Sequence, residues 1–359
     1  MASLTGTLTF LINPSLDQHT AQKEEQLVHI RAHFNYDPEE DIYIPCKELG
    51  ISFVRGDILH IINQDDPNWW QAYREGEEDQ ALAGLIPSRT FQEQREIIRH
   101  TLMAEGKDGA KGKKSKCNSC GRKHNKKNQK RKLYSSTGED LDAEEILTYE
   151  EVALYYPQPN RKRPIVLIGP PNVGRQELRE RLMETYPDRF GAAIPHTSRP
   201  RDDNEMDGKD YHFVPRHVFE ADIIEHKFVE YGEFEKHLFG TSLEAIRQVV
   251  SSGRICVLNL HPESLRVLKA SDMKPYILFV APPNIDKLRQ LRLSQGVIKV
   301  SDEELTEIIE KGRELEETYG HFFDHIITNF DLDRTYDELR GVIDQLEVEP
   351  QWVPAHWVT

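Results

Sequence analysis

The sequence contains little cysteine and no long apolar run. Its four cysteines, Cys46, Cys117, Cys120 and Cys256, are too few and too widely spaced for a disulfide framework, which indicates a reducing compartment. No run approaches the ~20 apolar residues of a membrane span, and residues 8–12 are too short and lack the charged leader of a signal sequence. We therefore expect a cytoplasmic protein, and the length of 359 residues suggests two or three domains.

Positive charge is scarce outside one segment. The formal net charge is −15, yet residues 107–132 carry twelve Lys or Arg and one acid, Asp108. A segment of this composition cannot bury a core, and it is typical of a disordered or partly helical linker. It is also typical of an element that binds an acidic surface, such as a calmodulin-like protein or anionic lipid. Both interpretations stay open.

The cysteine pair Cys117 and Cys120, with His124 nearby, lies inside this basic segment. A structural zinc site needs four ligands, and no second pair lies close in the sequence. Nucleic acid is disfavoured because no aromatic residue precedes Tyr134 in the segment and the acidic remainder repels phosphate. We expect neither a metal site nor nucleic-acid binding.

One stretch has the pattern of a strand, a phosphate-cradling turn and a helix. An uninterrupted apolar run, residues 165–168, precedes two glycines five positions apart, Gly169 and Gly174. A working P-loop then needs a lysine for the phosphates and a Ser or Thr for Mg²⁺. Those positions hold Arg175 and Gln176. The planar guanidinium of Arg175 replaces the compact ammonium of lysine, and the amide of Gln176 replaces the hydroxyl. We predict a degenerate P-loop that keeps its geometry without its chemistry.

A second block resembles the nucleoside-monophosphate site of guanylate kinases, without gaps over residues 196–213 and onward through 228–234 and 239–242. The resemblance implies a ligand pocket derived from the GMP site. Its phosphate would be held by Ser198, Arg199, Tyr211 and Thr241, and guanine would donate hydrogen bonds to Glu230. Two positions depart from the family, since Asp202 replaces a second arginine and Phe239 replaces a second tyrosine.

Further departures remove the catalytic groups. Asn259 and His261 stand where active enzymes carry two aspartates, and Ile309 replaces one arginine of the lid, although Arg289, Arg292 and Arg313 are present. Each lost contact to developing phosphoryl charge costs about 3 kcal/mol. Even with non-additive effects we expect no useful phosphoryl transfer, no catalytic residue and no cofactor.

Residues 28–91 resemble an SH3 domain in the order and spacing of their motifs. These motifs are residues 32–36, 51–59, 69–70 and 84–88. The resemblance implies a platform for a polyproline peptide, made by Phe34, Tyr36, Trp69, Pro87 and Phe91. We favour packing roles for these residues, because Phe34 lacks a hydroxyl for a ligand carbonyl and the loop 38–49 is long enough to cover the groove.

Two β-like pieces flank the kinase-like block, residues 144–152 and 350–358. The second carries two tryptophans and two prolines, which makes sense only if it returns to pair with another strand. Over residues 28–359 the chain thus resembles the membrane-associated guanylate kinase (MAGUK) family. This implies a multidomain fold: an all-β SH3-like domain split by a basic hook, and an α/β guanylate-kinase-like P-loop domain whose parallel sheet has helices on both faces.

The expected boundaries follow from this resemblance. Residues 1–27 form a tail, either frayed or holding a remnant of the last strand of a PDZ domain. The other segments are an SH3 domain at 28–98, a largely disordered basic hook at 99–145, a returning strand at 146–156, the guanylate-kinase-like domain at 162–347 and a strand packing back on SH3 at 348–359. Apolar runs predict strands at 255–260, 276–281 and 326–328. Helical spacing of apolar residues predicts helices at 92–99, 219–224, 243–250, 265–268, 301–317 and 336–346.

Residues 65–76, 144–151 and 225–236 resemble the palmitoylated membrane protein subfamily, nearest to Crumbs-associated polarity scaffolds of the Stardust type, in a form lacking most of the PDZ domain. The resemblance implies an inactive scaffold at the apical plasma membrane and cell junctions, with protein partners such as a Crumbs-type tail, a cytoskeletal linker at the hook, or a second copy joined by strand exchange. Alternatives are an active guanylate kinase using ATP and GMP, and an adaptor regulated by calmodulin or lipid at the hook.

The pocket derived from the GMP site leaves two interpretations open. Charge-assisted hydrogen bonds do not distinguish GMP from a phosphorylated or acidic peptide, so the pocket residues would bind such a partner. Alternatively these residues persist as packing and network residues, and Asp202 in place of an arginine weakens an anion site.

Overall fold

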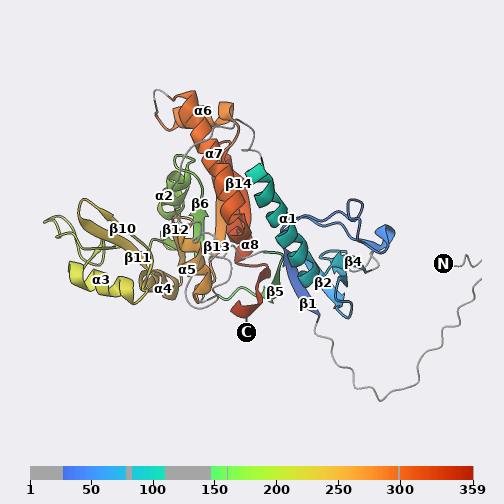
Figure 1. Ribbon diagram of the computed structural model, residues 1–359. Helices are drawn as coiled ribbons and strands as arrows, with labels where there is room; N and C mark the ends of the chain where they lie inside the picture. The colour runs from blue at the N-terminus through green and yellow to red at the C-terminus, as the bar shows by residue number, and fades with distance from the viewer. Residues whose placement is uncertain (1–26, 78–82, 110–146, 160, 298–299, 359) are drawn as a thin grey trace, which may run out of the picture. The chain divides into compact units, whose positions relative to one another are not determined.

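The computed structural model describes residues 27–77, 83–109, 147–159, 161–297 and 300–358 (Figure 1). The predicted PDZ remnant and the pair Cys117 and Cys120 lie outside these ranges. Within them, no helix combines the length and the apolar character needed to cross a membrane. The chain divides into two compact units, residues 1–151 and 152–359, which are described separately.

The first unit is a small antiparallel β structure. Its strands β1 (Val28–Ala32), β2 (Ile58–Asn63), β3 (Trp69–Arg74) and β4 (Gly84–Pro87) pair in sequence order, and a short helix η1 (Lys47–Leu49) precedes β2. The strand β5 (Tyr149–Tyr155) begins in this unit, where the His33 N–H donates to the Thr148 carbonyl at 2.9 Å. The core holds Ile30, Phe53, Leu59, Ile86 and Tyr149.

The helix α1 (Arg89–Gly109) follows β4 and is longer than predicted. It begins before residue 92 because the Ser88 hydroxyl caps it, accepting the Phe91 N–H at 3.2 Å. It continues past residue 99 into the segment expected to be disordered, over residues such as Leu, Met, Ala and Lys that favour helix. The start of the segment is thus helical up to Gly109, which agrees with its partly helical alternative, and residues 110–146 lie outside the described ranges.

The second unit is built on a five-stranded parallel sheet with the order β14-β13-β6-β12-β7. The strands are β6 (Ile165–Ile168), β7 (Phe190–Gly191), β12 (Ile255–Asn259), β13 (Tyr276–Ala281) and β14 (His325–Thr328). The central strand β6 is buried throughout, as its continuous apolar run predicts. The loops that follow β6 and β12 leave the same edge of the sheet, which brings the P-loop and Asn259 together.

Helices cover both faces of this sheet, which confirms the predicted α/β class. One core joins Val166 and Ile168 to α4 (Leu243–Ser251), α5 (Ser264–Ala270) and α7 (Asp302–Tyr319). The other joins Ile165 and Leu167 to α2 (Arg175–Thr185) and α8 (Leu332–Leu346). The start of α7 is set by a capping box of Ser301 and Glu304, and α6 (Ile285–Ser294) packs against α7.

A second sheet, which the sequence did not reveal as a sheet, lies at one end of this unit (Figure 1). Its order is β10-β11-β8-β9, with β8 (His196–Thr197), β9 (His212–Phe213), β10 (Phe228–Phe234) and β11 (His237–Ser242). The helix α3 (Arg216–Ile224) packs against it, and the rings of Phe219 and Phe228 stack at 4.3 Å. The β10–β11 turn places Glu235 and Lys236 at φ of 49° and 67°.

The carboxyl-terminal strand β15 (Gln351–Pro354) pairs antiparallel with the end of β5, with Trp352 opposite Leu154. Two short helices, η2 (Gly320–Phe322) and η3 (Ala355–Trp357), complete the unit. Trp357 is buried with Tyr155 and Val353, and its indole N–H donates to the Lys269 carbonyl at 3.1 Å. The two flanking β-like pieces thus form strands that pair with each other, while their place in the SH3 domain stays a prediction.

Candidate functional site

The turn between β6 and α2 keeps the backbone shape of a P-loop. Gly174 has a φ of 97°, and a side chain there would lie 2.5 Å from the Asn329 amide. A side chain at Gly169 would lie 2.5 Å from the Val280 carbonyl oxygen. Asn172 adopts a φ of 60°, a left-handed conformation that asparagine tolerates better than most residues. Close packing with β13 and with the start of α8 therefore preserves this turn without a nucleotide.

The loop cannot cradle phosphate with all of its backbone. A P-loop binds phosphate through successive N–H groups, and Pro170 and Pro171 have none. This loss of donors was not predicted from the sequence, although the two adjacent prolines lie between the two glycines. The turn is therefore poorer in donors than its shape suggests.

The two substituted metal positions are bonded to each other. The Asn259 side-chain amide at the end of β12 donates to the Gln176 side-chain oxygen at 2.9 Å. The Gln176 amide in turn donates to Glu180 at 2.6 Å, one turn along α2. An uncharged amide pair thus occupies the place where a hydroxyl and a carboxylate would hold Mg²⁺. Hard cations prefer charged oxygen ligands, so this arrangement disfavours the metal.

Arg175 does not offer a free cation to the cleft at this edge. Its guanidinium points back toward β6 and donates to the Leu167 carbonyl at 3.3 Å. Burial lowers the pKa of Arg175, and the nearby Glu230 opposes that shift. Together with Lys311, which is paired with Glu314 at 2.8 Å, it lines a cleft of about 580 Å³. We call this space the P-loop cleft.

Glu230, the predicted guanine acceptor, lies between two spaces. It lines the P-loop cleft and also a groove of about 1170 Å³ on the other side. Its carboxylate accepts the backbone N–H of His261 at 2.9 Å. Burial raises the pKa of Glu230, and the His261 hydrogen bond and Arg175 oppose that shift. The acceptor oxygen that guanine would use is thus partly engaged by the protein itself.

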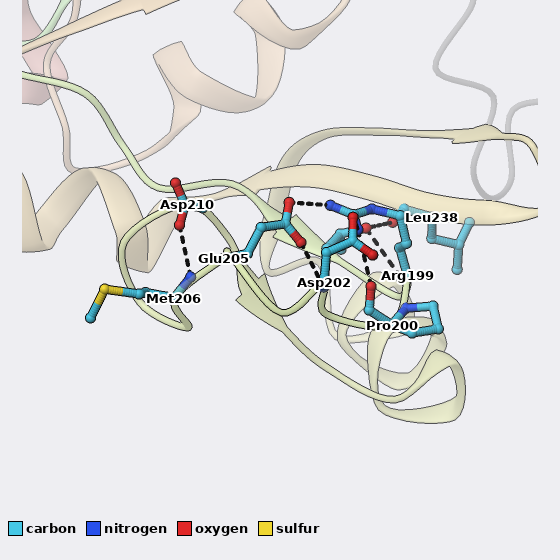
Figure 2. Close-up of polar contacts among 8 residues, drawn as sticks. Arg199, Pro200, Asp202, Glu205, Met206, Asp210 and Leu238 are labelled. Carbon is cyan, nitrogen blue, oxygen red and sulfur yellow. Dashed lines mark hydrogen bonds and ion pairs between the residues drawn. The ribbon is translucent and has the colours of Figure 1, made fainter.

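Arg199, the predicted phosphate ligand, is held by two carboxylates of its own loop. Figure 2 shows the Glu205 carboxylate between the Arg199 guanidinium, at 2.6 Å, and the Asp202 backbone N–H, at 3.0 Å. The Asp202 carboxylate accepts a second bond from Arg199 at 3.1 Å. The hydrogen bond from Arg199 lowers the pKa of Glu205, so this carboxylate stays ionised. The guanidinium charge is balanced before any ligand arrives.

The other predicted phosphate ligands divide into two groups. The Ser198 hydroxyl, one residue after β8, accepts the Leu238 N–H of β11 at 2.8 Å. Tyr211, Phe239 and Thr241 line the groove of about 1170 Å³. The structure thus brings Tyr211, Phe239, Thr241 and Glu230 together, while Ser198 serves the sheet and Arg199 is internally paired. Of the positions predicted as lost, Asn259 and His261 line the P-loop cleft, and Asp202 binds Arg199.

Two of the three lid arginines are also engaged, and Arg313 is exposed on α7. Arg289 forms an ion pair with Asp302, and Arg292 donates to Gln295 at 3.1 Å. Ile309 packs against the small core between α6 and α7. These contacts stabilise the lid helices on each other.

In the first unit, the predicted SH3 platform is largely covered. Tyr36 and Trp69 are buried, and Phe34 packs edge-on against Phe53 and Tyr149. Pro87 is buried in β4. These positions support packing roles, in line with the interpretation favoured from the sequence.

The loop 38–49 reaches the last platform residue, Phe91. The ring centroids of Tyr43 and Phe91 lie 6.3 Å apart, and the rings meet edge to face. The guanidinium carbon of Arg95 lies 5.3 Å from the centroid of the Phe91 ring. Arg95 is bonded to Asp41 at 2.9 Å, and the Asp41 side chain is only 1% exposed. This buried ion pair holds the loop against α1.

Family models match both parts of the chain. The guanylate kinase model matches residues 161–346, and the variant SH3 domain model matches residues 29–94. The structure of the SH3–kinase fragment of tight junction protein 3 aligns with 91% of this chain and 99% of that fragment at 18% identity. The TM-score of this alignment is 0.40.

Curated relatives align over the whole chain. Protein PALS1 of Danio rerio is 52% identical over 359 residues, which are 100% of this chain and 52% of that protein. MAGUK p55 subfamily member 7 of Xenopus tropicalis is 38% identical over 100% of this chain and 64% of that protein. Member 2 of the same subfamily from Homo sapiens is 36% identical over 100% and 60%. The chain thus spans between about half and two thirds of the length of these relatives.

Proposed function

This chain belongs to the membrane-associated guanylate kinase family, with an SH3 domain and a guanylate kinase domain, and we propose that it is a catalytically inactive scaffold. The observation that carries the proposal is the amide pair of Gln176 and Asn259 at 2.9 Å. It fills the metal position with uncharged groups. The adjacent prolines and the inward-facing Arg175 remove further phosphate contacts.

The size of the expected loss supports inactivity. Each missing contact to transferring phosphoryl charge costs about 3 kcal/mol, or roughly 10²-fold in rate. The lysine, the hydroxyl and both carboxylates are replaced together, and even strongly non-additive effects leave a rate far below that of a working kinase. The retained fold then serves as a surface for protein partners.

The test is a coupled assay with ATP, GMP and Mg²⁺ on the whole chain. Ordinary kinases turn over at about 1–100 s⁻¹, and we expect no ADP release above the rate without GMP. The matched variant combines Arg175→Lys, Gln176→Ser and Asn259→Asp, and we expect it to bind Mg²⁺·ATP more tightly than the parent in a fluorescent-nucleotide titration. Turnover by the parent within the ordinary range would overturn the proposal.

We extend the proposal to place and partners. The resemblance of residues 65–76, 144–151 and 225–236 to Crumbs-associated polarity scaffolds supports a scaffold at the apical membrane and cell junctions, with a Crumbs-type cytoplasmic tail among its partners. The experiment is capture of the purified chain by an immobilised tail peptide, with a scrambled peptide as control. Equal retention on both peptides would count against this partner.

The basic segment 107–132 is a second docking element in this proposal. Its twelve cations in an otherwise acidic chain favour an acidic partner such as a calmodulin-like protein or a cytoskeletal linker. Residues 110–146 lie outside the described structure. Deletion of residues 107–132 should abolish retention on immobilised calmodulin, and unchanged retention would exclude this role. Dimerisation by exchange of the returning strand stays a prediction, which light scattering of the whole chain would check.

A further inference from the structure

Tyr43, in the loop 38–49 of the first unit, follows a run of acidic residues. Four of the six residues before it are acidic, Asp37, Glu39, Glu40 and Asp41, and none is basic. The pattern of charge around a target residue is one of the features by which kinases select their substrates. A protein tyrosine kinase with a basic substrate cleft would be attracted to this run.

The position of Tyr43 makes it accessible to another protein. Tyr43 is 63% exposed, and Ile42 before it is 82% exposed. Residues 42–45 belong to no helix or strand, and they form no backbone-to-backbone hydrogen bond with any other residue that the structure describes. Segments with few such bonds open locally at a low cost in free energy. The tyrosine can therefore enter a kinase active site while the rest of the domain stays folded.

Two other exposed tyrosines lack this sequence context. Tyr156 is 66% exposed, but its two nearest preceding acids lie five and six positions before it. Tyr231 is 57% exposed, but the six residues before it include a cation, Lys227. Because the three tyrosines are similarly exposed, the acidic run is what distinguishes Tyr43.

A buried carboxylate fixes the position of Tyr43. The Asp41 side chain is 1% exposed, and one of its oxygens accepts a hydrogen bond from the Arg95 guanidinium at 2.9 Å. Its other oxygen accepts the backbone N–H of Tyr43 at 2.9 Å. The guanidinium carbon of Arg95 lies 5.9 Å from the centroid of the Tyr43 ring. Asp41 and Arg95 thus connect the tyrosine to α1.

A phosphate on Tyr43 would compete with Asp41 for Arg95. It adds about −1.5 to −2 charge and three strong acceptor oxygens near pH 7. The guanidinium already lies beside the Tyr43 ring, so a side-chain rotation suffices to form charge-assisted hydrogen bonds with the phosphate. Asp41 would then be a buried carboxylate without its cation, which is costly. The contact between the loop and α1 would therefore weaken.

The charge of the loop acts in the same direction. Glu39 and Glu40 are exposed on the turn that leads to Tyr43. A phosphate placed next to carboxylates is repelled by them, which favours a more open loop.

We propose that Tyr43 is a phosphorylation site for a protein tyrosine kinase with a basic substrate cleft, and that its phosphate releases the loop 38–49 from α1. The γ-phosphoryl group of ATP forms a bond to the phenol oxygen of Tyr43 as its bond to ADP breaks, and the phenol proton passes to the catalytic base of the kinase. The inference concerns the SH3 domain alone and goes beyond the proposed function. Turnover in the guanylate kinase assay would leave it intact.

The first test treats the full chain with ATP, Mg²⁺ and the catalytic domain of a tyrosine kinase that phosphorylates poly(Glu,Tyr). Mass spectrometry then gives the initial rate of phosphorylation at each tyrosine. We expect Tyr43 to react at least about tenfold faster than Tyr156 or Tyr231, because only Tyr43 follows an uninterrupted acidic context. Equal rates at the three tyrosines would overturn the inference.

Paired variants test whether the kinase recognises the acidic run. The double variant Glu39→Gln and Glu40→Gln should slow phosphorylation of Tyr43 about fivefold, since exposed ion pairs each contribute modestly. The control variant Glu307→Gln and Glu310→Gln removes the same charge from the exposed face of α7 and should change the rate less than about twofold. Equal slowing in both variants would show general attraction to an acidic chain and overturn the inference.

The second test measures hydrogen exchange of the loop by mass spectrometry, before and after complete phosphorylation. We expect the amides of residues 39–46 to exchange at least about fivefold faster in the phosphorylated chain, with no change in α2. Tyr43→Phe, treated with the kinase in the same way, is the control and should exchange like the parent. Unchanged or slower exchange in the phosphorylated parent would show that the phosphate leaves the loop in place, which overturns the inference.

A further variant tests whether the phosphate acts through Arg95. Asp41→Asn together with Arg95→Gln removes both charges of the pair, so that no unpaired charge is buried. The loop of this variant should exchange faster than that of the parent, and complete phosphorylation of Tyr43 should then change the exchange less than about twofold. An acceleration as large as in the parent would show that the phosphate does not act through this pair and would overturn the inference.

Discussion

The P-loop cleft and the pocket derived from the GMP site differ in how the groups at their expected phosphate-binding positions are engaged. At the P-loop cleft the residues themselves changed, and Gln176 and Asn259 now bond each other at 2.9 Å. In the pocket derived from the GMP site Arg199 is retained, but Glu205 and Asp202 are bonded to its guanidinium. A retained binding residue is therefore no evidence of a retained binding site until its partners are known.

The two regions also differ in what supports them. The P-loop rests on the buried parallel sheet, through Leu178 and Leu182 of α2. The pocket derived from the GMP site rests on the smaller core of Phe219, Phe228 and Leu238. We expect the second region to be more sensitive to a single core change, because fewer side chains share the burial.

The largest effect on the free energy of unfolding should come from truncating one buried side chain in each of these two cores. Phe219→Ala should lower the free energy of unfolding by about 3–5 kcal/mol and Leu178→Ala by about 2–5 kcal/mol, through lost burial and residual cavities. Urea unfolding followed by circular dichroism measures both. A clearly larger loss in Leu178→Ala than in Phe219→Ala would contradict the greater sensitivity expected of the smaller core.

The next effect tests whether Glu205 blocks the retained arginine. Glu205→Gln removes the carboxylate that holds Arg199 and should raise the affinity for GMP about tenfold, as a charge-assisted bond becomes available to the phosphate. Isothermal titration calorimetry measures this affinity, with Glu307→Gln as the matched control. If both variants bind GMP like the parent, the carboxylate is not what closes the site.

A smaller effect tests the amide pair in the P-loop cleft. Gln176→Ala leaves the Asn259 amide without its bond and should lower the free energy of unfolding by about 0.5–1.5 kcal/mol. The double variant Gln176→Ala and Asn259→Ala should cost little more than the single one, because no polar group is then left unpaired. Thermal unfolding of the parent, the single variant and the double variant measures the loss in each. A double variant that loses about twice as much stability as the single one would contradict the expectation.

The smallest effect is a pair of opposite pH dependences. The folded pKa of Glu205 is depressed by Arg199, so its stabilising contribution is present above the unfolded pKa and disappears as pH falls through the folded pKa. The folded pKa of Glu230 is raised by burial, so its ionisation destabilises the fold as pH rises above the unfolded value of about 4.3.

At pH 7, Glu230→Gln should therefore raise the thermal midpoint by on the order of 1–3 °C, while Glu205→Gln lowers it. Near pH 3 the Glu230 difference should vanish, since that carboxyl group is then protonated in both states, whereas the Glu205 difference should shrink as pH falls toward its folded pKa. Scanning calorimetry at the two pH values measures these shifts. The same sign for both variants at pH 7 would contradict the assigned environments.

Much of the parallel-sheet domain was readable from local pattern. The run at 276–281 forms β13 over those residues, and the predicted helices at 243–250 and 336–346 lie within α4 and α8. Burial on both strand faces and helical periodicity are local properties of a sequence, so these elements were found. The sheet of β8 to β11 was missed, because two of its strands have only two residues each and carry no periodic signal.

The site was predicted unevenly for the same reason. The identities of Arg175, Gln176 and Asn259 were enough to predict a degenerate metal site. The bond from Asn259 to Gln176 spans 83 positions, and the pair of Asp41 and Arg95 spans 54, so no local pattern reveals either contact. The engagement of Arg199 by Glu205 spans only six positions, but it depends on a turn that composition does not specify.

The sequence by itself determined which chemical groups this protein possesses: a P-loop without lysine or hydroxyl, a strand end without carboxylates, and a monophosphate site with its arginine. Only the tertiary structure decided which of those groups face a ligand and which face each other. The physical reason is that hydrogen bonds and ion pairs depend on distances of about 3 Å. Only the folded chain brings residues from distant parts of the sequence that close.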